Sequence, residues 1–590
     1  MDTMKGLRRS HYCGDVTQPG TEVTVGGFVD RVRNTGGVLF VILRDRTGTV
    51  QLTFNDETDR AVFEKAQSLR GEYVVMAHGK VCERENPNEK MKTGRVEIMA
   101  DDLRILSKAQ TPPFEIVEDS NANEELRLKY RYLDLRRAPL QKNIIMRHEI
   151  ARAAREYFYD NGFIEIETPM MMRSTPEGAR DYLVPSRIHP GSFYALPQSP
   201  QIYKQLLMVS GFDRYIQLAR CFRDEDLRAD RQPEFTQIDL EMSFVDEDDI
   251  RRCVEGFIAY VFEKVLGKKV QLPLPHLTFA DAMNRYGSDK PDTRFGYEIT
   301  DITADVKDID FVVFRSAVET GGSVRAINIK GGASVYTRKE IDKLTEHAKG
   351  IGAKGLAYIR WAEDEPNISF KKFLGEGDAE KIFSAVGAEK GDLVLICADR
   401  NKVVLTVLGA LRCICAKRMG VIDESLYNFL WITEMPFFEQ DEETGEWAAA
   451  HHPFTMPMEE CLDILDSDPA NVRAKAWDLV LNGTELSSGS MRITDFELQQ
   501  RMFEALGLTE EEIAAKFGFL VDAYRYGAPP HGGMGIGLDR LAMILCGASS
   551  LRDVTAFPKV QNASELMSGC PSPVDRENLD ILGISVQEQE

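Results

Sequence analysis

The chain has 590 residues, of which 43% are hydrophobic and 28% are charged, and this length suggests three or four domains. Lys and Arg number 72 and Asp and Glu 94, so the net charge of −22 excludes a protein that coats nucleic acid with a basic surface. The ten cysteines include no CxxC pair, which argues against a zinc ribbon and fits reduced thiols in a cytoplasmic chain. We expect no signal peptide and no membrane span, because the sequence offers no apolar run of about 18 residues.

Residues 1–113 have the pattern of a small β domain. Apolar residues predict a helix at 59–69 and five strands, at 23–29, 38–43, 50–54, 73–81 and 96–106. A helix between the third and fourth of five strands is typical of an OB-fold barrel. This segment has 17 Lys and Arg against 16 Asp and Glu, so the acidic excess lies in the rest of the chain.

The remaining sequence changes character several times after the proline pair that ends this domain. We predict an α+β multidomain protein, in which a charged and helical stretch at 124–137 lies within a hinge. The predicted segments are the hinge at 114–140, a central domain at 141–296, an inserted α+β domain at 297–425, the continuation of the central domain at 426–559 and a C-terminal extension at 560–590.

Two common phosphate-binding loops are missing from the sequence. No GxxxxGK[ST] stretch is present, and the glycines at 533–537 are followed by Leu538 where GxGxxG needs another glycine. If the protein binds a nucleotide, it therefore does so through another architecture.

Residues 220–244 predict a hairpin, with strands at 218–222 and 235–244 and a charged loop between them. Arg223 is suited to a phosphate, Glu225 to an exocyclic amine and Phe235 to stacking on a purine. A solvated charged hairpin with no ligand is the alternative.

Residues 532–545 predict a strand, a tight glycine turn and a helix that begins near Arg540. The glycines would let a ligand approach the backbone, and Arg540 would give positive charge to a polyphosphate. In the alternative interpretation, Arg540 only pairs with Asp539 or a surface acid.

Four further side chains have the chemistry of a substrate or metal site. Glu485 is suited to Mg²⁺, and Asp478 lies two turns before it if residues 474–481 are helical, so that both face one metal. Arg492 is suited to clamping a carboxylate, although an ordinary strand salt bridge is the alternative. Neighbouring histidines on a strand point to opposite faces, so we assign hydrogen bonding at a substrate, rather than a shared metal, to His451. A core histidine is the alternative there.

These segments together resemble the class II aminoacyl-tRNA synthetases. Residues 162–169 (GFIEIETP) resemble motif 1, residues 220–244 motif 2 and residues 535–545 motif 3. The OB domain places the resemblance in the aspartyl, asparaginyl and lysyl subgroup. The insertion and the stretches STPEGARDY, QSPQIYKQ, HHPFT and AFPK are similar to the bacterial-type aspartyl family. The resemblance implies a catalytic domain built on an antiparallel sheet with flanking helices.

The resemblance also implies a reaction and its partners. The family activates L-aspartate with ATP and Mg²⁺ to aspartyl-adenylate and transfers the aspartyl group to the 3′ end of tRNA(Asp). It implies a cytoplasmic homodimer, formed through a helix at 143–159 and a strand at 163–167, with no membrane partner. The implied catalytic residues are Arg223, Glu225 and Arg540, and the implied metal ligands are Asp478 and Glu485. The implied ATP contacts are Arg223, Asp224, Glu225, Gln232, Phe235, Glu485, Gly537, Leu538, Asp539 and Arg540.

The same resemblance assigns the amino-acid pocket. Arg492 and Lys204 would bind the aspartate side chain, and the other implied contacts are Glu177, Gln201, Arg223, Asp239 and His451. An asparagine carboxamide would leave two buried cations without an anion, so we expect roughly a thousandfold discrimination from charge alone.

The OB domain would bind the anticodon. Phe40 is placed to stack on a base and Gln51 to bond a base edge, while Arg31 and Arg33 would meet phosphates. Barrel core is the alternative for Phe40.

Some features leave alternatives open. Residues 487–489 (SSG) stand where many relatives have glycines, and Asn34-Thr35 lies at a variable position, so charging of tRNA(Asn) as well as tRNA(Asp) stays open. The competing functions are an asparaginyl or lysyl synthetase, an RNA-binding protein on an inactive synthetase fold, and an amide ligase that needs no tRNA.

Overall fold

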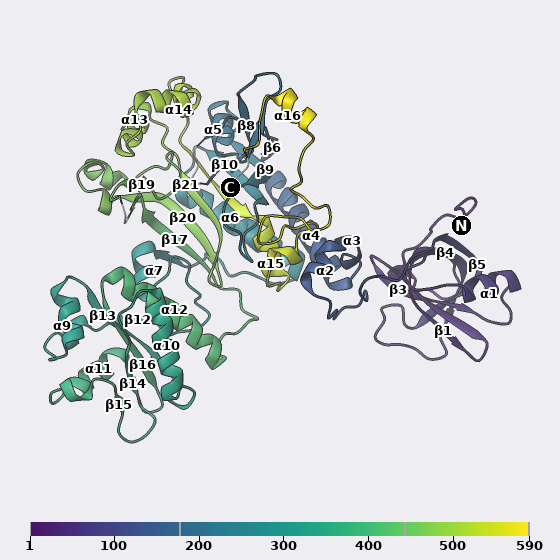
Figure 1. Cartoon of the computed structure of the whole chain (residues 1–590), viewed down its shortest axis with the longest axis horizontal. Coiled ribbons are helices and arrows are strands. Elements are labelled where there is room, and N and C mark those ends of the chain that lie inside the picture. Colours follow the sequence, from purple (N-terminus) through teal and green to yellow (C-terminus); the bar gives the residue numbers. More distant parts are fainter. Residues whose placement is uncertain (1, 176–178, 442–443, 588–590) are drawn as a thin grey trace. The chain divides into compact units, whose positions relative to one another are not determined.

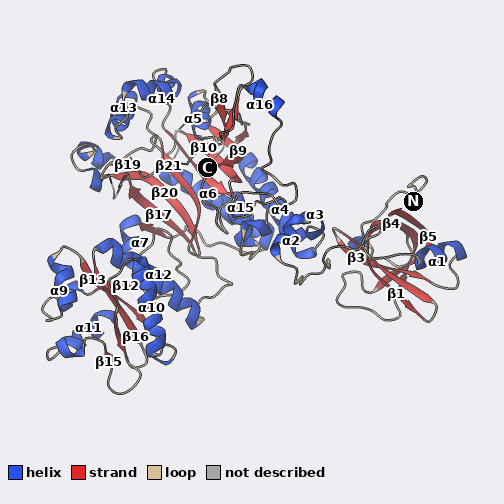
Figure 2. Ribbon diagram, in the orientation of Figure 1, coloured by secondary structure: helices blue, strands red, loops and turns tan. Residues whose placement is uncertain are grey.

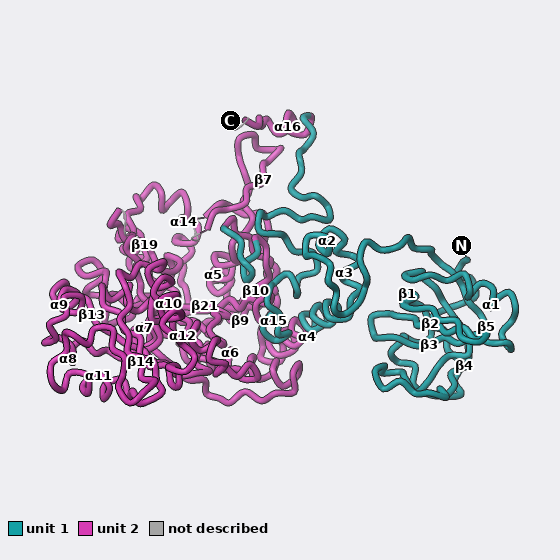
Figure 3. Tube along the Cα trace, turned by 60° about the horizontal axis from the view of Figure 1, so that its bottom comes forward, with its two compact units in different colours: residues 1–149, 226–232, 542–576 teal, residues 150–225, 233–541, 577–590 magenta. Residues whose placement is uncertain are grey.

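The computed structural model describes residues 2–175, 179–441 and 444–587, and Figures 1 and 2 show its helices and strands. The chain forms two compact units (Figure 3). Unit 1 contains residues 1–149, 226–232 and 542–576, and unit 2 contains residues 150–225, 233–541 and 577–590. Each unit therefore brings together segments that are far apart in the sequence.

The N-terminal part of unit 1 is a closed five-stranded barrel in the order β1-β2-β3-β5-β4. Its strands are β1 (Glu22–Thr35), β2 (Val38–Asp45), β3 (Gly48–Phe54), β4 (Val74–Glu83) and β5 (Val96–Ser107). Side chains such as Val25, Val41 and Leu52 are fully buried inside the barrel. Helix α1 (Arg60–Gln67) begins where Asp59 accepts hydrogen bonds from two backbone N–H groups, and it lies between β3 and β4 as predicted. These elements confirm the OB-fold prediction.

Unit 2 is built on an eight-stranded sheet in the order β11-β17-β20-β21-β22-β10-β9-β6. All neighbours are antiparallel except at the two edges, where β11 pairs with β17 and β6 with β9 in parallel. The strands are β11 (His276–Thr278), β17 (Phe429–Pro436), β20 (Arg473–Leu481), β21 (Thr484–Met491), β22 (His531–Gly537), β10 (Glu234–Ser243), β9 (Arg214–Phe222) and β6 (Ile164–Glu165).

The predicted hairpin at residues 220–244 is confirmed, because β9 and β10 pair from Glu234 opposite Phe222 to Met242 opposite Arg214. Edge strand β6 is only two residues long, shorter than the predicted strand at 163–167. Of the strand, tight glycine turn and helix predicted over 532–545, the strand β22 and the helix α15 (Leu538–Leu545) are present, but the turn is wrong, since the glycines lie within β22, which runs directly into α15.

The predicted insertion forms its own five-stranded sheet in unit 2, in the order β12-β13-β16-β14-β15. Helices α10 (Arg338–Ile351) and α12 (Asn401–Met419) pack on one face. Helices α8 (Thr303–Val306), α9 (Val312–Glu319) and α11 (Asp378–Val386) pack on the other, so the sheet is covered on both sides (Figure 1). The strands are β12 (Ile299–Asp301), β13 (Ser323–Ile329), β14 (Ala357–Arg360), β15 (Asn367–Ile368) and β16 (Leu393–Asp399).

The other helices connect these sheets or cover them. They are α2 (Glu124–Lys129), α3 (Arg131–Asp134), α4 (Ala138–Asp160), α5 (Gln201–Val209), α6 (Glu247–Val261), α7 (Phe279–Tyr286), α13 (Phe496–Ala505), α14 (Glu510–Tyr524) and α16 (Arg576–Leu582). Two small hairpins complete the fold, β7 (Leu183–Pro185) with β8 (Phe193–Ala195) and β18 (Phe438–Gln440) with β19 (Trp447–Ala449). Across the described ranges, no helix combines the length and apolar character that a membrane crossing requires.

Candidate active site

Two buried carboxylates lie side by side on the central strand β10 of unit 2. Asp239 and Glu241 are two residues apart, so both side chains leave the same face of the sheet. Lys204, from helix α5, reaches between them, with its Nζ 2.9 Å from Asp239 Oδ1 and 3.3 Å from Glu241 Oε2. All three side chains are nearly inaccessible to solvent. The two-residue repeat of β10 thus places both carboxylates on one face, where Lys204 from α5 contacts them.

Arg492 completes this group from the segment that follows β21. Its Nε and Nη2 donate to Glu241 at 2.8 and 3.0 Å, a bidentate pair that fixes the guanidinium plane. Its Nη1 lies 2.6 Å from Nε2 of His452 and also donates to the Ser490 hydroxyl. Because Glu241 bonds both Arg492 and Lys204, the two cations are already paired before any substrate is bound.

This pairing corrects the charge argument made from the sequence. That argument took Arg492 and Lys204 to be without anions when no aspartate side chain is present. The structure gives them Glu241 and Asp239, so two positive and two negative charges balance at the site. A neutral ligand would therefore not leave bare cations, and the thousandfold discrimination from charge alone does not follow.

The protonation of this group follows from its contacts. Burial raises the pKa of Glu241, but the charges of Arg492 and Lys204 outweigh it and bring the pKa to about 2. Burial raises the pKa of Asp239 in spite of Lys204. Burial and the positive charge of Arg492 hold the pKa of His452 well below its ordinary value. His452 is therefore neutral and accepts from Arg492.

The glycines of β22 make room for these carboxylates. Gly533 lies directly opposite Glu241 in the strand pairing and Gly535 opposite Asp239. A Cβ at Gly533 would collide with the Glu241 carboxylate and with the Leu240 carbonyl. The glycine-rich sequence is thus explained by close packing against buried acids.

The predicted metal ligands lie on a β-hairpin, so the predicted helix at 474–481 is wrong. Strand β20 turns at Asn482-Gly483, both with positive φ, into β21, which places Asp478 and Glu485 on neighbouring strands. The strand alternates between half-buried and buried residues over 473–476 and is buried throughout 476–481, as suits a strand in the interior of the sheet.

Asp478 has the features of a cation ligand. Its Oδ1 is buried and accepts no hydrogen bond from any residue in the described part of the chain. Burial and the nearby charge of Glu485 raise its pKa to about 8. A divalent cation between the two carboxylates would satisfy the orphaned oxygen and offset their repulsion, so the residues fit Mg²⁺. Lys290 lies 3.8 Å from Glu485 and supplies part of that charge now.

Two predicted nucleotide contacts carry positive charge at the same sheet. The Arg223 guanidinium lies 5.1 Å from the centre of the Phe235 ring, across the base of the β9–β10 hairpin. Arg540, in the first turn of α15, donates from Nη1 to the Glu485 carbonyl at 2.6 Å, which holds it beside the predicted metal ligands.

A family model described as "tRNA synthetases class II (D, K and N)" matches residues 123–561. The chain belongs to this family of class II synthetases. A second model, described as an OB-fold nucleic acid binding domain, matches residues 23–106 of the synthetase, within its barrel.

Curated relatives are similar to the synthetase over its full length. An aspartate–tRNA(Asp/Asn) ligase from Caldanaerobacter subterraneus subsp. tengcongensis is 55% identical and covers 99% of both chains. An aspartate–tRNA ligase from Ruminiclostridium cellulolyticum is 54% identical and covers 100% of both.

Solved structures share the fold of the synthetase at low sequence identity. Asparaginyl-tRNA synthetase from Pyrococcus horikoshii with asparaginyl-adenylate has a TM-score of 0.57 at 18% identity, covering 94% of this chain and 98% of the other. Aspartyl-tRNA synthetase from Entamoeba histolytica has a TM-score of 0.55 at 19% identity, covering 94% and 92%. These likenesses support the predicted antiparallel-sheet architecture.

Other predicted site residues of the synthetase have varied surroundings. Leu538 is buried in the core, and Asp539 accepts from the Thr236 backbone N–H at 2.7 Å. Asp224 faces Arg180 at 3.5 Å, and Glu225 is half-buried. Gly537 ends β22, and Gln232 belongs to unit 1. Glu177 lies outside the described residues.

The four predicted tRNA contacts share the outer face of the barrel. Arg31 pairs with Ile42 and Arg33 with Phe40 across β1 and β2, so the side chains of each pair point the same way. Gln51 follows on β3, opposite Ile42, but it is buried, donates to Glu97 at 2.7 Å and accepts from Arg84 at 2.9 Å. The half-exposed Phe40 is thus placed outside the barrel core.

Sequence reasoning missed Glu241 and also His452, whose Nε2 lies 2.6 Å from Arg492 Nη1. The period of two after Asp239 was the available signal for Glu241. His451 and His452 follow β19 in an irregular segment, so the prediction that they alternate on a strand is wrong. His451 nevertheless has a buried Nε2 that bonds no described residue, as a ligand-facing group would.

Proposed function

We propose that this synthetase is an aspartate–tRNA ligase, which activates L-aspartate with ATP and transfers the aspartyl group to tRNA(Asp). The observation that carries the proposal is the buried group of Arg492 and Lys204 around Glu241. Two further buried atoms, Gln201 Nε2 and His451 Nε2, make no hydrogen bond with any described residue. Full-length relatives named as aspartate–tRNA ligases support the same substrate.

The amino acid would bind by charge and hydrogen bonding. Arg492 and Lys204 would donate to the side-chain carboxylate, and Asp239, Gln201 and Glu177 would accept from the ammonium group. The Gln201 Nε2, buried and bonded to no described residue, is available for a substrate oxygen. His451 would close the pocket.

Activation would need no side-chain nucleophile. An oxygen of the aspartate α-carboxylate attacks the α-phosphorus of ATP, a new P–O bond forms, and the bond to pyrophosphate breaks. Arg223 would stabilise charge on the α-phosphate, while Phe235 stacks on adenine and Glu225 accepts from its amine. Arg540 would bind the γ-phosphate, with further ATP contacts at Asp224, Gln232, Gly537, Leu538 and Asp539. Asp478 and Glu485 would hold Mg²⁺, which when bound offsets the charge on the phosphates.

Discrimination against asparagine would depend on geometry as well as charge. With Glu241 as counterion, the pocket presents fixed N–H donors from Arg492 and Lys204, and a carboxamide NH₂ opposite a donor would leave both groups unpaired. An unpaired buried polar group costs about 1–3 kcal/mol, or roughly 10- to 100-fold.

The test is ATP–pyrophosphate exchange with aspartate, asparagine and lysine in turn. We expect exchange with aspartate only. Exchange with asparagine or lysine but not aspartate would contradict the proposal, and no exchange with any amino acid would favour an inactive fold.

A second substrate, tRNA(Asn), is favoured by one observation. A relative that is 55% identical over the full length bears the name aspartate–tRNA(Asp/Asn) ligase. Charging purified tRNA(Asp) and tRNA(Asn) side by side with aspartate decides between a strict and a relaxed enzyme.

We further propose a cytoplasmic homodimer. A groove of about 370 Å³ beside α4 and β6 is lined by the apolar Tyr159, Phe163 and Ile216 together with charged Arg155, Glu156, Asp160 and Glu165, and Tyr159 is 79% exposed. All ten cysteines are free thiols, as a reducing compartment requires.

Sedimentation at micromolar concentration tests the dimer. The proposed segments are 1–113, 114–140, 141–296, 297–425, 426–559 and 560–590.

A further inference from the structure

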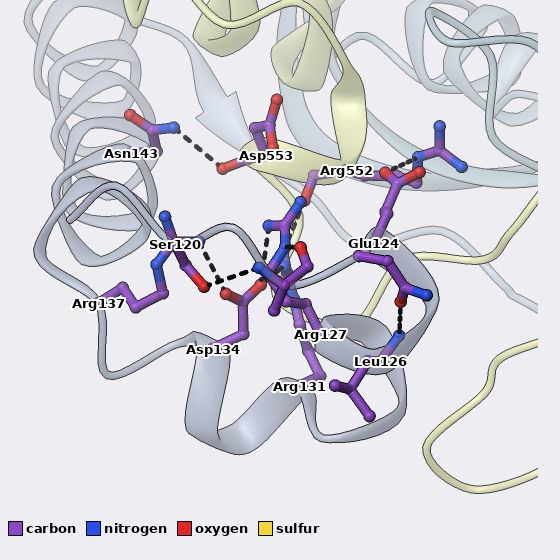
Figure 4. Close-up of polar contacts among 12 residues, drawn as sticks. Ser120, Glu124, Leu126, Arg127, Arg131, Asp134, Arg137, Asn143, Arg552 and Asp553 are labelled. Carbon is purple, nitrogen blue, oxygen red and sulfur yellow. Dashed lines mark hydrogen bonds and ion pairs between the residues drawn. The ribbon is translucent and has the colours of Figure 1, made fainter. Parts of the chain in front are cut away.

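Three arginines surround one buried carboxylate in unit 1. Asp134, at the end of α3, is fully buried and accepts from Arg131 and from Arg137 at 2.9 Å each, and Arg127 lies 3.5 Å away (Figure 4). We call Arg127, Arg131, Asp134 and Arg137 the hinge hub. Charged donors on both carboxylate oxygens fix the direction of the guanidinium groups.

Arg131 turns its other N–H groups toward the chain that follows motif 3. Its Nε donates to the Ala556 carbonyl at 2.9 Å, and its Nη2 donates to the carbonyls of Thr555 at 2.9 Å and Arg552 at 2.6 Å. One planar side chain thus holds three backbone carbonyls within residues 552–556, a geometry that lysine cannot reproduce. The Asn143 amide adds a hydrogen bond to the Asp553 carbonyl at 3.2 Å.

The same segment contacts the outer part of the motif 2 loop, residues 226–232, which also belongs to unit 1. The Leu551 N–H donates to the Ala229 carbonyl at 3.0 Å. Gln232 donates to the Lys559 carbonyl at 3.2 Å and accepts from the Lys559 N–H at 2.9 Å. Residues 551–559 therefore lie between the hub and the loop, bonded to both.

We propose that Arg131 and Asp134 are positioning residues for the motif 2 loop. Asp134 orients Arg131, Arg131 fixes residues 552–556, and the segment 551–559 holds the loop at Ala229 and Gln232. Neither hub residue touches a substrate. The proposal rests on the proposed function in one respect, since Gln232 is there a contact to ATP.

The test compares Arg131→Lys with the wild type in two measurements. Lysine keeps the charge but cannot hold three carbonyls, so we expect about tenfold faster hydrogen–deuterium exchange in peptides covering 226–232 and 551–559. In ATP–pyrophosphate exchange we expect the KM for ATP to rise about tenfold, as for one lost hydrogen bond. The KM for aspartate should stay within about twofold, because Lys204, Asp239, Glu241 and Arg492 of the proposed pocket lie on α5, on β10 and directly after β21, and all belong to unit 2.

Arg127→Lys is the matched control. Among the described residues, Arg127 donates hydrogen bonds to the Ala122 carbonyl at 3.2 Å and to Asp134 at 3.5 Å but not to residues 552–556, and lysine keeps its charge. Loop exchange and the KM for ATP should therefore stay at wild-type values. Asp134→Asn is the second variant and should reproduce the Arg131→Lys pattern.

Three outcomes would overturn the proposal. These are wild-type loop exchange in Arg131→Lys, an equal rise of both KM values with faster exchange throughout, and the same pattern in Arg127→Lys. If the wild type shows no aspartate-dependent activity, the proposed function fails, and hydrogen–deuterium exchange alone still decides the positioning role.

Discussion

The hinge hub and the proposed aspartate pocket (Lys204, Asp239, Glu241 and Arg492, with Gln201 and His451) both contain a buried arginine beside a carboxylate. They differ in how many of their buried polar atoms have hydrogen-bond partners. In the hub, Arg131 donates to Asp134 and to three backbone carbonyls. Such an arginine holds chain segments together and leaves little for a ligand to bond.

The aspartate pocket is only partly satisfied. Arg492 and Lys204 are paired with Glu241, yet the Gln201 Nε2 and His451 Nε2 bond no residue within the described ranges. Buried polar atoms are rarely left without partners unless something else binds them. The contrast separates two charge clusters of similar composition: the hinge hub is assigned to holding chain segments together, and the pocket to binding a substrate.

Replacing Arg492 should give the largest effect. Arg492→Ala removes the substrate's cation and leaves Glu241 buried without its bidentate partner, a loss of about 3–5 kcal/mol. We expect aspartate-dependent pyrophosphate exchange to fall about a thousandfold. Arg137→Ala in the hub is the comparison, and it should lower the melting temperature while keeping the KM for aspartate. Equal changes of that KM in both variants would erase the distinction.

Filling the space opposite Glu241 should come next. Gly533→Ala would force a Cβ against the Glu241 carboxylate, and overpacking of this kind costs about 1–3 kcal/mol. Thermal unfolding should show a lower midpoint and weaker aspartate activation. The matched control is Gly518→Ala in α14, where a Cβ meets nothing within 4 Å and the midpoint should rise slightly. A Gly533→Ala variant as stable as the control would contradict the packing.

The pH dependence of stability tests the pocket's histidine. Burial lowers the pKa of His451 to about 4, against about 6.5 in an unfolded chain. Below pH 6.5 the unfolded chain takes up a proton that the folded one does not, so stability present above that pH is lost as the pH falls. The loss at pH 5 is about 2 kcal/mol. Urea unfolding at pH 7.5 and pH 5 measures how much the free energy of unfolding declines between them. The decline should be about 2 kcal/mol smaller in His451→Asn than in the wild type. Identical declines in the two proteins would contradict the lowered pKa of His451.

The smallest effect concerns the barrel. Phe40→Ala removes a stacking surface worth about 1–3 kcal/mol per base, so the KM for tRNA should rise about tenfold. Pyrophosphate exchange, which needs no tRNA, should be unchanged and serves as the internal control. Equal loss in both assays would mean that Phe40 supports the fold.

Local pattern was enough to predict the barrel and the motif 2 hairpin. Alternation over Val23–Val29 and the turn-bounded apolar runs that follow each report burial on one face of a sheet, which depends only on nearby residues. The hairpin at Arg223 and Phe235 is predictable for the same reason, because the charged loop joins two consecutive strands.

The sequence pattern did not predict contacts where a helix and a hairpin fit the same spacing, or where the two residues in contact are far apart in the sequence. A spacing of seven would place Asp478 and Glu485 two turns apart if residues 474–481 were helical, yet a two-residue turn brings the same pair onto neighbouring strands. Glu241 is 251 residues from Arg492, and no spacing rule connects them.

The sequence by itself determined the fold class, the family resemblance and the kinds of side chain at the site, because motifs and burial patterns are local. Only the tertiary structure decided which charges are paired: Glu241 between Lys204 and Arg492, Asp134 among three arginines, and Asp478 with an orphaned oxygen. The net charge of −22 says nothing about these sites. Pairing depends on distances of a few ångströms between residues that lie on different strands and helices, and the folded backbone alone sets those distances.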